Sequence, residues 1–163
     1  MPPDVRNPSL VERPAVSMPD GGDLDSGEDT APIDYDALDR IGHRLAGSER
    51  FGDVDFRPKY APNSVVLSFD LGYFPAGVEQ VSLHVRWYEN DDFSFHYVEH
   101  WEDSDRWECR WDRHPNTHNT REHLHPPPDA ATPGTDEFYP DDWRDVVVAV
   151  LQELDAHIKA FWE

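Results

Sequence analysis

The sequence predicts an α+β domain in which an antiparallel four-stranded meander is covered on one face by an N-terminal helix and a long C-terminal helix. Two patterns predict this fold class. Apolar and polar residues alternate with a period of two between residues 63 and 112, which is typical of strands with one buried face. Apolar residues recur at helical spacing on both sides of that segment. The apolar sheet face and the two helix stripes would bury one another in a two-layer sandwich.

The N-terminal helix is predicted to begin after Asp34, whose side chain can cap it, and to end at Gly47. The residues before it, 1–33, contain six prolines and seven acidic residues but few large apolar side chains. Such a segment buries too little apolar surface to offset the entropy of ordering, so we expect a disordered lead followed by a single domain over residues 34–163. The apolar stripe of the helix consists of Tyr35, Leu38, Ile41 and Leu45.

Four strands are predicted between residues 63 and 112, separated by turn sequences at 72–77, 89–92 and 103–105. Alternate side chains of each strand should point to the same face of the sheet. Those expected to face the core are Val65, Leu67, Phe69 and Leu71 in the first strand, Val81, Leu83, Val85 and Trp87 in the second, Phe93, Phe95 and Tyr97 in the third, and Trp107, Cys109 and Trp111 in the fourth.

The segment 115–140 contains six prolines and shows little periodicity, so it is predicted to be a loop. A second helix is predicted to follow, with Asp141 as its cap. Its apolar residues are spaced at i, i+3, i+4 and i+7, which is the clearest helical pattern in the chain. They are Trp143, Val146, Val147, Val150, Leu151, Leu154, Ile158 and Phe161.

Acidic residues outnumber basic ones by 34 to 14, which gives a formal net charge of −20. The carboxylates are spread along the chain, a pattern typical of halophilic proteins, because molar salt screens charges beyond about 3 Å. The single cysteine, Cys109, excludes an intramolecular disulfide. No apolar run approaches the roughly 20 residues that span a bilayer, and no secretory signal opens the chain. We therefore expect a cytoplasmic protein that makes no membrane contact.

The polar sides of the predicted strands carry an unusual set of histidines and arginines. If neighbouring strands pair in register, alternation brings these side chains onto one surface of the sheet. A solvated face of a one-sided sheet would explain the same pattern, and that alternative stays open. The residues are His84, Arg86, His96, His100, Glu108 and Arg110.

The segment 106–125 contains four arginines and three acidic residues, so it is locally basic in a chain whose net charge is −20. Selection for salt tolerance would favour carboxylates here as elsewhere. Retained cations therefore point to an anionic ligand, most simply a phosphate bound by guanidinium groups. We predict that Arg113 and Arg121, together with Arg86 and His96 of the predicted sheet, bind the substrate.

Four of the nine histidines lie within residues 114–125. Because imidazole titrates near neutral pH, two histidines beside arginines suit metal-independent cleavage of RNA, in which one accepts the 2′-hydroxyl proton and the other protonates the leaving oxygen. This hypothesis requires no cofactor and no metal. Two alternatives stay open: a zinc site, although no Cys pair or helical His-Glu motif accompanies it, and histidines that bond carbonyl groups of their own loop. The candidate zinc ligands are His114, His118, His123 and His125, with Asp112 as a further possibility.

The run from Arg110 to Pro126 has an Arg-x-Asp core, a His-Pro step and a closing His-x-His, and it resembles the TumE family of toxin proteins. The resemblance covers residues 35–160 and implies a short antiparallel sheet with a C-terminal helix. It also implies the toxin half of a toxin–antitoxin pair, whose antitoxin TumA is typically a small DNA-binding protein. The chain departs from the family pattern at Arg113 and at 116–119. The matching positions, to which the resemblance assigns importance, are Arg110, Asp112, His114, His123 and His125.

The leading hypothesis is therefore a cytoplasmic toxin that cleaves RNA and is paired with a TumA-like antitoxin. We assign catalysis to the five positions that match the family pattern. The alternatives are a non-catalytic module that binds a partner protein through the polar face or the basic loop, and a zinc-binding protein.

Overall fold

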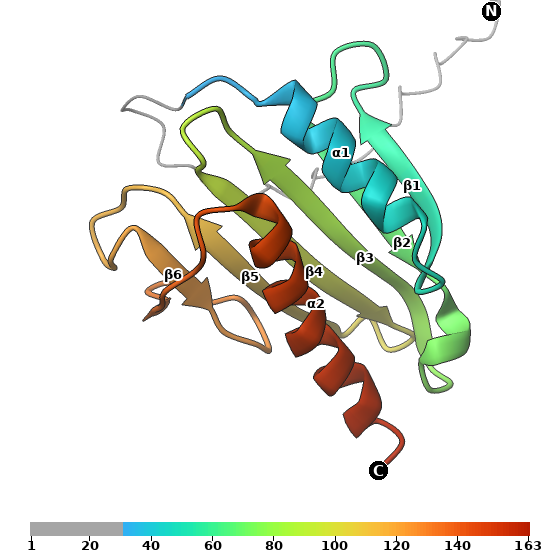
Figure 1. Cartoon of the computed structure of the whole chain (residues 1–163). Coiled ribbons are helices and arrows are strands. Elements are labelled where there is room, and N and C mark those ends of the chain that lie inside the picture. Colours follow the sequence, from blue (N-terminus) through green and yellow to red (C-terminus); the bar gives the residue numbers. More distant parts are fainter. Residues whose placement is uncertain (1–30) are drawn as a thin grey trace, which may run out of the picture.

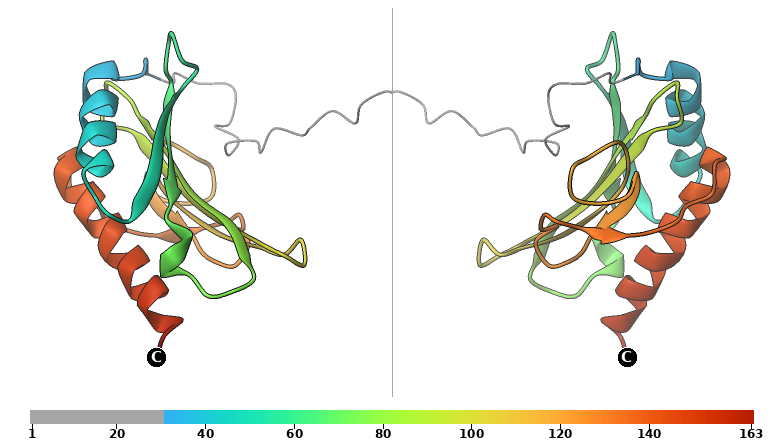
Figure 2. Two further views of the ribbon diagram at one scale, coloured as in Figure 1. Left: turned by 90° about the vertical axis from the view of Figure 1, so that its right-hand side faces the viewer. Right: turned by 90° about the vertical axis from the view of Figure 1, so that its left-hand side faces the viewer.

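The computed structural model describes residues 31–163. In this part of the chain, seven antiparallel strands form one sheet in chain order, β1 to β7, and both helices cover the same face of that sheet (Figure 1, Figure 2). The fold class is α+β, as predicted. The elements are α1 Tyr35–Ala46, β1 Phe51–Arg57, β2 Ser64–Phe69, the 3-10 helix η1 Leu71–Tyr73, β3 Val78–Trp87, β4 Phe93–Trp101, β5 Arg106–Arg113, β6 Glu122–His125, β7 Thr135–Asp136 and α2 Trp143–Ala160.

The predicted meander corresponds to β2, β3, β4 and β5, so the prediction of four strands is too low. The sequence pattern does not reveal β1, because a bulge between Phe51 and Asp53 breaks its alternation. It also does not reveal β6 and β7, which are four and two residues long and lie among the prolines of the segment 115–140. Part of that predicted loop is therefore sheet, and β6 extends the polar face beyond β5.

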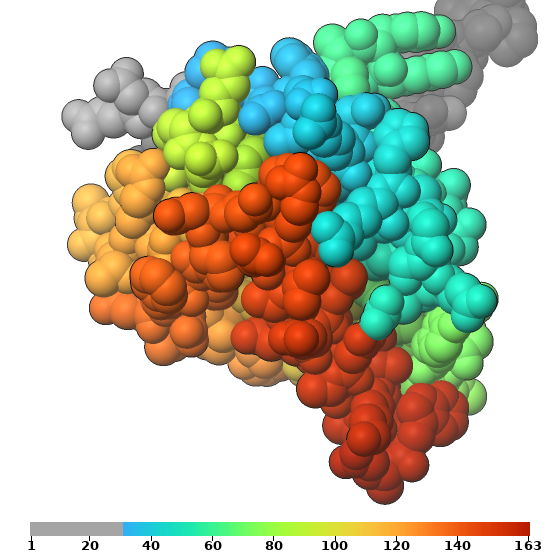
Figure 3. Space-filling view, viewed as in Figure 1, coloured from blue at the N-terminus to red at the C-terminus, as the bar shows by residue number. Residues whose placement is uncertain are grey.

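Both predicted helices are confirmed. The Asp34 side chain caps α1 by accepting a hydrogen bond from Ala37 N at 2.9 Å. The cap of α2 is Asp142 instead of Asp141, because the Asp142 carboxylate accepts from Arg144 N at 2.8 Å. The space-filling view shows α2 beside α1 on the same face of the molecule (Figure 3). Fully buried residues of α2 are Val146, Val147, Val150 and Leu154.

The core lies between the sheet and the two helices. Antiparallel register aligns Val65, Val85, Phe95 and Trp111 as successive neighbours from β2 to β5, and each is at most 2% exposed. Leu71 is a correction to the predicted core. It is 42% exposed and lies in η1, because β2 ends at Phe69.

The predicted disordered lead, residues 1–33, lies outside the described residues except for its last three. Ile33 forms an isolated antiparallel bridge with Tyr88, and Pro32 O accepts from Glu89 N at 2.9 Å. The segment immediately before α1 is therefore attached to the end of β3. Within residues 31–163, neither helix is long and apolar enough to cross a membrane.

Candidate functional site

The face of the sheet opposite the helices carries the polar side chains that the sequence places there. In one cross-strand row, His84 is the neighbour of His96, His96 of Arg110, and Arg110 of His125. The predicted register is therefore confirmed, and β6 adds a fourth strand to the surface. The adjacent row, also running from β3 to β6, consists of Arg86, Ser94, Asp112 and His123.

Asp112 lies on this face near the end of β5 and is 1% exposed. Its Oδ2 atom lies 3.4 Å from Nε2 of His125, 3.6 Å from Nε2 of His114 and 3.7 Å from Nε2 of His123. Arg110 Nε donates to the same oxygen at 2.6 Å. Residues two apart on a strand point to the same side, so the His-x-His of β6 directs both imidazoles toward Asp112. We call these five residues the Asp112 cluster; they are the five positions predicted to be catalytic.

Backbone carbonyl groups fix the other ring nitrogen of each histidine. His114 Nδ1 lies 2.9 Å from Pro115 O, His123 Nδ1 lies 3.1 Å from Thr120 O, and His125 Nδ1 lies 3.0 Å from Ala131 O. A carbonyl oxygen only accepts, so each Nδ1 must carry a hydrogen. In neutral imidazole, Nε2 then presents a lone pair, and all three Nε2 atoms face the Asp112 carboxylate.

The amide of Asn116 is also close to one of these rings. Its Nδ2 atom lies 3.3 Å from His123 Nδ1, but it has acceptors of its own in Thr120 O at 3.2 Å and His114 O at 3.4 Å. The hydrogen between His123 and Thr120 is therefore assigned to the imidazole.

The charges of the cluster perturb its ionisation. Burial alone would raise the pKa of Asp112, but the imidazoles of His114 and His125 and the Arg110 guanidinium lower it well below its ordinary value. Burial would lower the pKa of His114, but the adjacent Asp112 carboxylate raises it overall. Burial lowers the pKa of His123. These neighbours thus favour the charged form of Asp112.

The histidines of β6 are buried although no helix covers them. His123 is 1% exposed and His125 is 4% exposed. The chain after β6 returns along β5, where Pro128 O accepts from Glu108 N at 2.8 Å and Asp129 forms a parallel bridge with Glu108. This return closes over one side of the cluster, because it also supplies Ala131 O to His125.

Arg113, which the sequence predicts to bind substrate, does not join the cluster. It lies on the helix-covered side of β5 and is 4% exposed. Its guanidinium donates to Glu122 Oε1 at 3.0 Å, to Asp91 O at 3.0 Å, to Tyr139 O at 3.1 Å and to Pro140 O. These contacts tie β5 to the segment that leads into α2, and they engage each nitrogen of the guanidinium.

The other predicted substrate-binding residues are separated. Arg121 is half-exposed in the loop before β6 and pairs with Asp92. His96 lies on the polar face, with Nε2 2.7 Å from Glu108 Oε2, and burial lowers its pKa. Arg86 lies in the same cross-strand row as Asp112. His96 and Arg86 thus share a surface with the cluster, whereas Arg121 lies at its border.

Two asparagines organise the loop that carries His114, and neither is predicted from the sequence to be functional. Asn116 Oδ1 accepts from His118 N at 2.9 Å, and Asn119 exchanges hydrogen bonds with the backbone of Gly134 at 2.7 and 2.9 Å. The signal that could reveal them is their position in a turn-like run, because asparagine side chains often bond nearby backbone groups. His118, one of the candidate zinc ligands, is exposed and lies outside the cluster.

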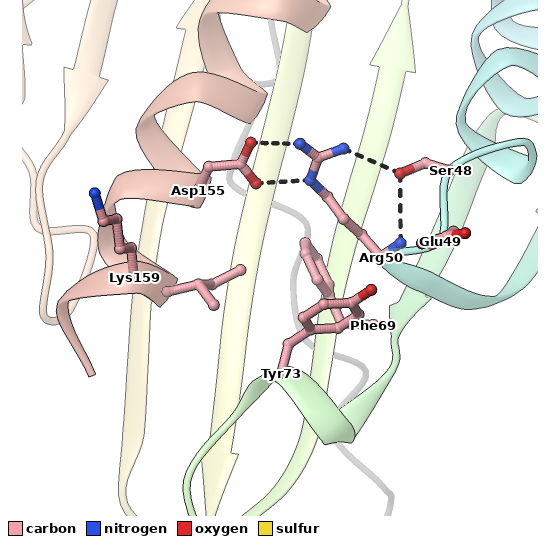
Figure 4. Close-up of a pocket in the computed structure, with 8 residues that line it drawn as sticks. Ser48, Glu49, Arg50, Phe69, Tyr73, Asp155 and Lys159 are labelled. Carbon is pink, nitrogen blue, oxygen red and sulfur yellow. Dashed lines mark hydrogen bonds and ion pairs between the residues drawn. The ribbon is translucent and has the colours of Figure 1, made fainter. Parts of the chain in front are cut away.

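Two cavities lie elsewhere. One of about 570 Å³ opens between α2 and the start of β1, and Phe69 and Tyr73 are among the residues that line it (Figure 4). The Arg50–Asp155 ion pair crosses it, with Arg50 Nε 2.6 Å from Asp155 Oδ1. The second, of about 360 Å³, lies beside Glu99 and His157. Neither contains the Asp112 cluster. The cluster has the denser set of groups that can transfer protons or bind anions, so it is the candidate functional site.

The fold and site define a small α+β protein in which two helices cover one face of an antiparallel meander and the other face carries a buried Asp-His-Arg cluster. The family model described as Toxin TumE matches residues 39–158, which include the whole cluster, and the chain belongs to this family. It is therefore the toxin of a toxin–antitoxin system, as its resemblance implies, and it has an antitoxin partner. No curated protein and no solved structure matches the chain.

Proposed function

We propose that this toxin cleaves RNA at the Asp112 cluster. The observation that supports the proposal is the convergence of three imidazoles and one guanidinium on a single carboxylate, on the sheet face that the helices leave uncovered. Phosphodiester cleavage requires groups that move protons near neutral pH and cations that stabilise charge on phosphorus. The cluster offers both.

The reaction is an internal transfer. A base removes the proton of the 2′-hydroxyl, the O2′–P bond forms, the P–O5′ bond breaks, and an acid returns a proton to O5′. The products carry a 2′,3′-cyclic phosphate and a 5′-hydroxyl. In the proposed scheme Arg110 stabilises the charge on the phosphorus oxygens, because its Nε is held by Asp112 while its terminal nitrogens are not hydrogen-bonded within residues 31–163.

The burial of the three histidines suggests different roles. The side chain of His114 is 14% exposed, against 1% for His123 and 5% for His125. His114 is therefore the imidazole best placed to exchange a proton with RNA. His123 and His125 are less exposed than His114, so their role would be to hold the Asp112 carboxylate in position.

High salt constrains how RNA would be held. Counterion release weakens non-specific binding in concentrated salt, so a chain with a net charge of −20 must rely on directed hydrogen bonds from individual side chains. Arg86 and Arg106 suit this role, because both lie on the polar face and the Arg106 side chain is 37% exposed.

The proposal is tested with purified toxin and a labelled RNA oligonucleotide in molar KCl. We expect wild-type protein to produce fragments ending in a 2′,3′-cyclic phosphate and His114→Ala to lose at least about 100-fold in cleavage rate. The matched control is His118→Ala, which removes an exposed imidazole from the same loop. Uncut RNA with folded wild-type protein, or equal rates for His114→Ala and His118→Ala, would contradict the proposal.

The cognate antitoxin in this proposal is a small DNA-binding protein of the TumA type encoded beside the toxin. The family membership supports a partner, and its DNA-binding character comes from the resemblance alone. Co-expression of the neighbouring gene should restore growth and yield a complex that binds its own promoter DNA. A partner that neutralises the toxin without binding DNA would overturn this part.

A further inference from the structure

We propose that Asp112, His123 and His125 bind a divalent transition-metal ion, with His114 beside the open coordination position. One potential ligand atom from each of the first three residues lies within 4.8 Å of the others, and all three residues are buried. Strand pairing creates this arrangement: Asp112 and His123 are direct cross-strand neighbours, and His125 follows two positions later on the same face.

The spacing of the ligand atoms fits an ion better than hydrogen bonds. A charged imidazole–carboxylate hydrogen bond is about 2.7–2.9 Å long. Asp112 Oδ2 makes such a short contact with Arg110 Nε, at 2.6 Å, but it lies 3.4 Å from His125 Nε2 and 3.7 Å from His123 Nε2. Neighbouring ligands of a tetrahedral ion with bonds of about 2.0–2.1 Å are about 3.3–3.4 Å apart. The His125 distance matches this separation, and the His123 distance is somewhat longer, so both imidazoles lie nearer to the spacing of ligands around one ion than to a charged hydrogen bond.

The hydrogen-bond pattern behind the ligands supports the same conclusion. Metal-binding imidazoles characteristically donate their other N–H to a carbonyl or carboxylate, which fixes the tautomer that presents a lone pair to the ion. His123 Nδ1 faces Thr120 O and His125 Nδ1 faces Ala131 O. Without a cation or added protons, lone pairs on both rings would face a carboxylate, and that contact is repulsive.

Asp112 provides an independent sign of a missing ligand. Its Oδ1 atom is buried and has no hydrogen-bond partner within residues 31–163. Leaving such an atom unsatisfied costs free energy, so buried oxygens of this kind usually have a partner. The Arg110 contact does not prevent metal binding, because a carboxylate offers about four lone-pair sites and ligating carboxylates are often hydrogen-bonded as well.

The donor set indicates which ions fit. Two imidazoles and one carboxylate suit Zn²⁺, Fe²⁺ or Co²⁺ better than the all-oxygen sites that Mg²⁺ and Ca²⁺ prefer. Three protein ligands would leave a position open, and His114 is the nearest further imidazole, with its Nε2 atom 3.6 Å from Asp112 Oδ2. This is the arrangement of catalytic metal sites, whereas structural sites have four protein ligands.

This inference rests on the proposed function and deepens it, because the ion would be held where RNA is cleaved. Metal binding is nevertheless measured without RNA, so the two proposals fail separately. Protein that binds metal but leaves RNA intact would remove the ribonuclease proposal and keep the metal site. Protein that cuts RNA in the presence of a chelator and binds no metal would remove the metal site and keep the ribonuclease proposal.

The experiment titrates chelator-treated, full-length protein with Zn²⁺ and with Co²⁺ in molar KCl, by calorimetry and by visible absorption. We expect one equivalent of either ion to bind, with affinity reduced at least about 100-fold in Asp112→Asn and His125→Ala. His118→Ala should bind as wild type does. Less than a tenth of an equivalent on wild type, or unchanged binding in both cluster variants, would overturn the proposal.

Variants of buried residues can fail to fold, so a measurement on wild-type protein decides that case. Zn²⁺ should shift the NMR resonances of the His123 and His125 rings and leave those of the His118 ring unmoved. Shifts confined to other histidines would overturn the proposal, because the ion would then be bound elsewhere.

Discussion

Asp112 and His123 are direct cross-strand neighbours on β5 and β6, and both are 1% exposed although they point away from the helices. A sheet face without helices is ordinarily wet. Here the chain after β6 folds back along β5 and contacts Glu108 and His125 beside the pair. A carboxylate and an imidazole on the face without helices are therefore buried, which is an environment that perturbs pKa values.

Arg113 is expected to stabilise the fold and not to bind substrate. Arg113→Lys removes a planar guanidinium that donates to four acceptors in three segments of the chain. We therefore expect the free energy of unfolding to fall by about 2–3 kcal/mol. Arg121→Lys is the control, because the Arg121 guanidinium is half-exposed and has a single partner in the described part of the chain, Asp92, so the loss should be smaller, at about 1 kcal/mol. Urea denaturation at constant KCl measures both. Equal losses would show that the Arg113 contacts contribute little.

The period of two in β5 accounts for the position of Arg113. The alternation that places Arg110 and Asp112 on the polar face also places Arg113 on the core face, together with Trp111. Its position was therefore predictable from the period of two. Local charge alone suggested a phosphate ligand, and local charge does not distinguish the two faces of a strand.

The four central strands and both helices follow from the sequence because each has a regular apolar period. Strands β1 and β6 do not follow from the sequence. The bulge in β1 breaks its period, and β6 spans only residues 122–125. The members of the Asp112 cluster could likewise be predicted from residue type and alternation. Their burial could not, because it depends on where a proline-rich loop closes, and no local pattern encodes that path.

Glu99 is the second buried carboxylate whose partner can be tested. It is 0% exposed on the core side of β4, and His157 of α2 lies 2.7 Å away while stacking on Trp107 at 4.0 Å. His157→Ala would leave this charge buried without its partner, and we expect a loss of about 3 kcal/mol. Adding Glu99→Gln should restore part of it. A double variant no more stable than His157→Ala in urea denaturation would contradict the ion-pair explanation.

His84 should make the protein sensitive to mild acid. Burial, followed by nearby positive charges, lowers the pKa of His84 to about 4, against about 6.5 in the unfolded chain. Between these values the unfolded chain binds a proton that the folded chain does not. Stability is therefore full above about pH 6.5 and falls as the pH decreases toward 4. The charged and titratable groups near the imidazole are His96, Arg57, Arg86 and Arg106.

The variant His84→Gln removes this linkage. We expect it to lose less stability than wild type between about pH 7 and pH 4.5, by on the order of 1–2 kcal/mol. His118→Gln, which changes an exposed imidazole, should follow the wild-type profile. Parallel pH profiles for His84→Gln and wild type in urea denaturation would contradict the prediction.

The Asp112 cluster is tested most directly by growth of a halophilic host that lacks the antitoxin and expresses wild-type toxin or Asp112→Asn. The substitution keeps the shape of a buried side chain and removes the charge on which three imidazoles converge. We predict that wild type arrests growth and that Asp112→Asn does not, at equal levels of folded protein. Growth arrest by Asp112→Asn as complete as that by wild type would contradict a functional role for the cluster.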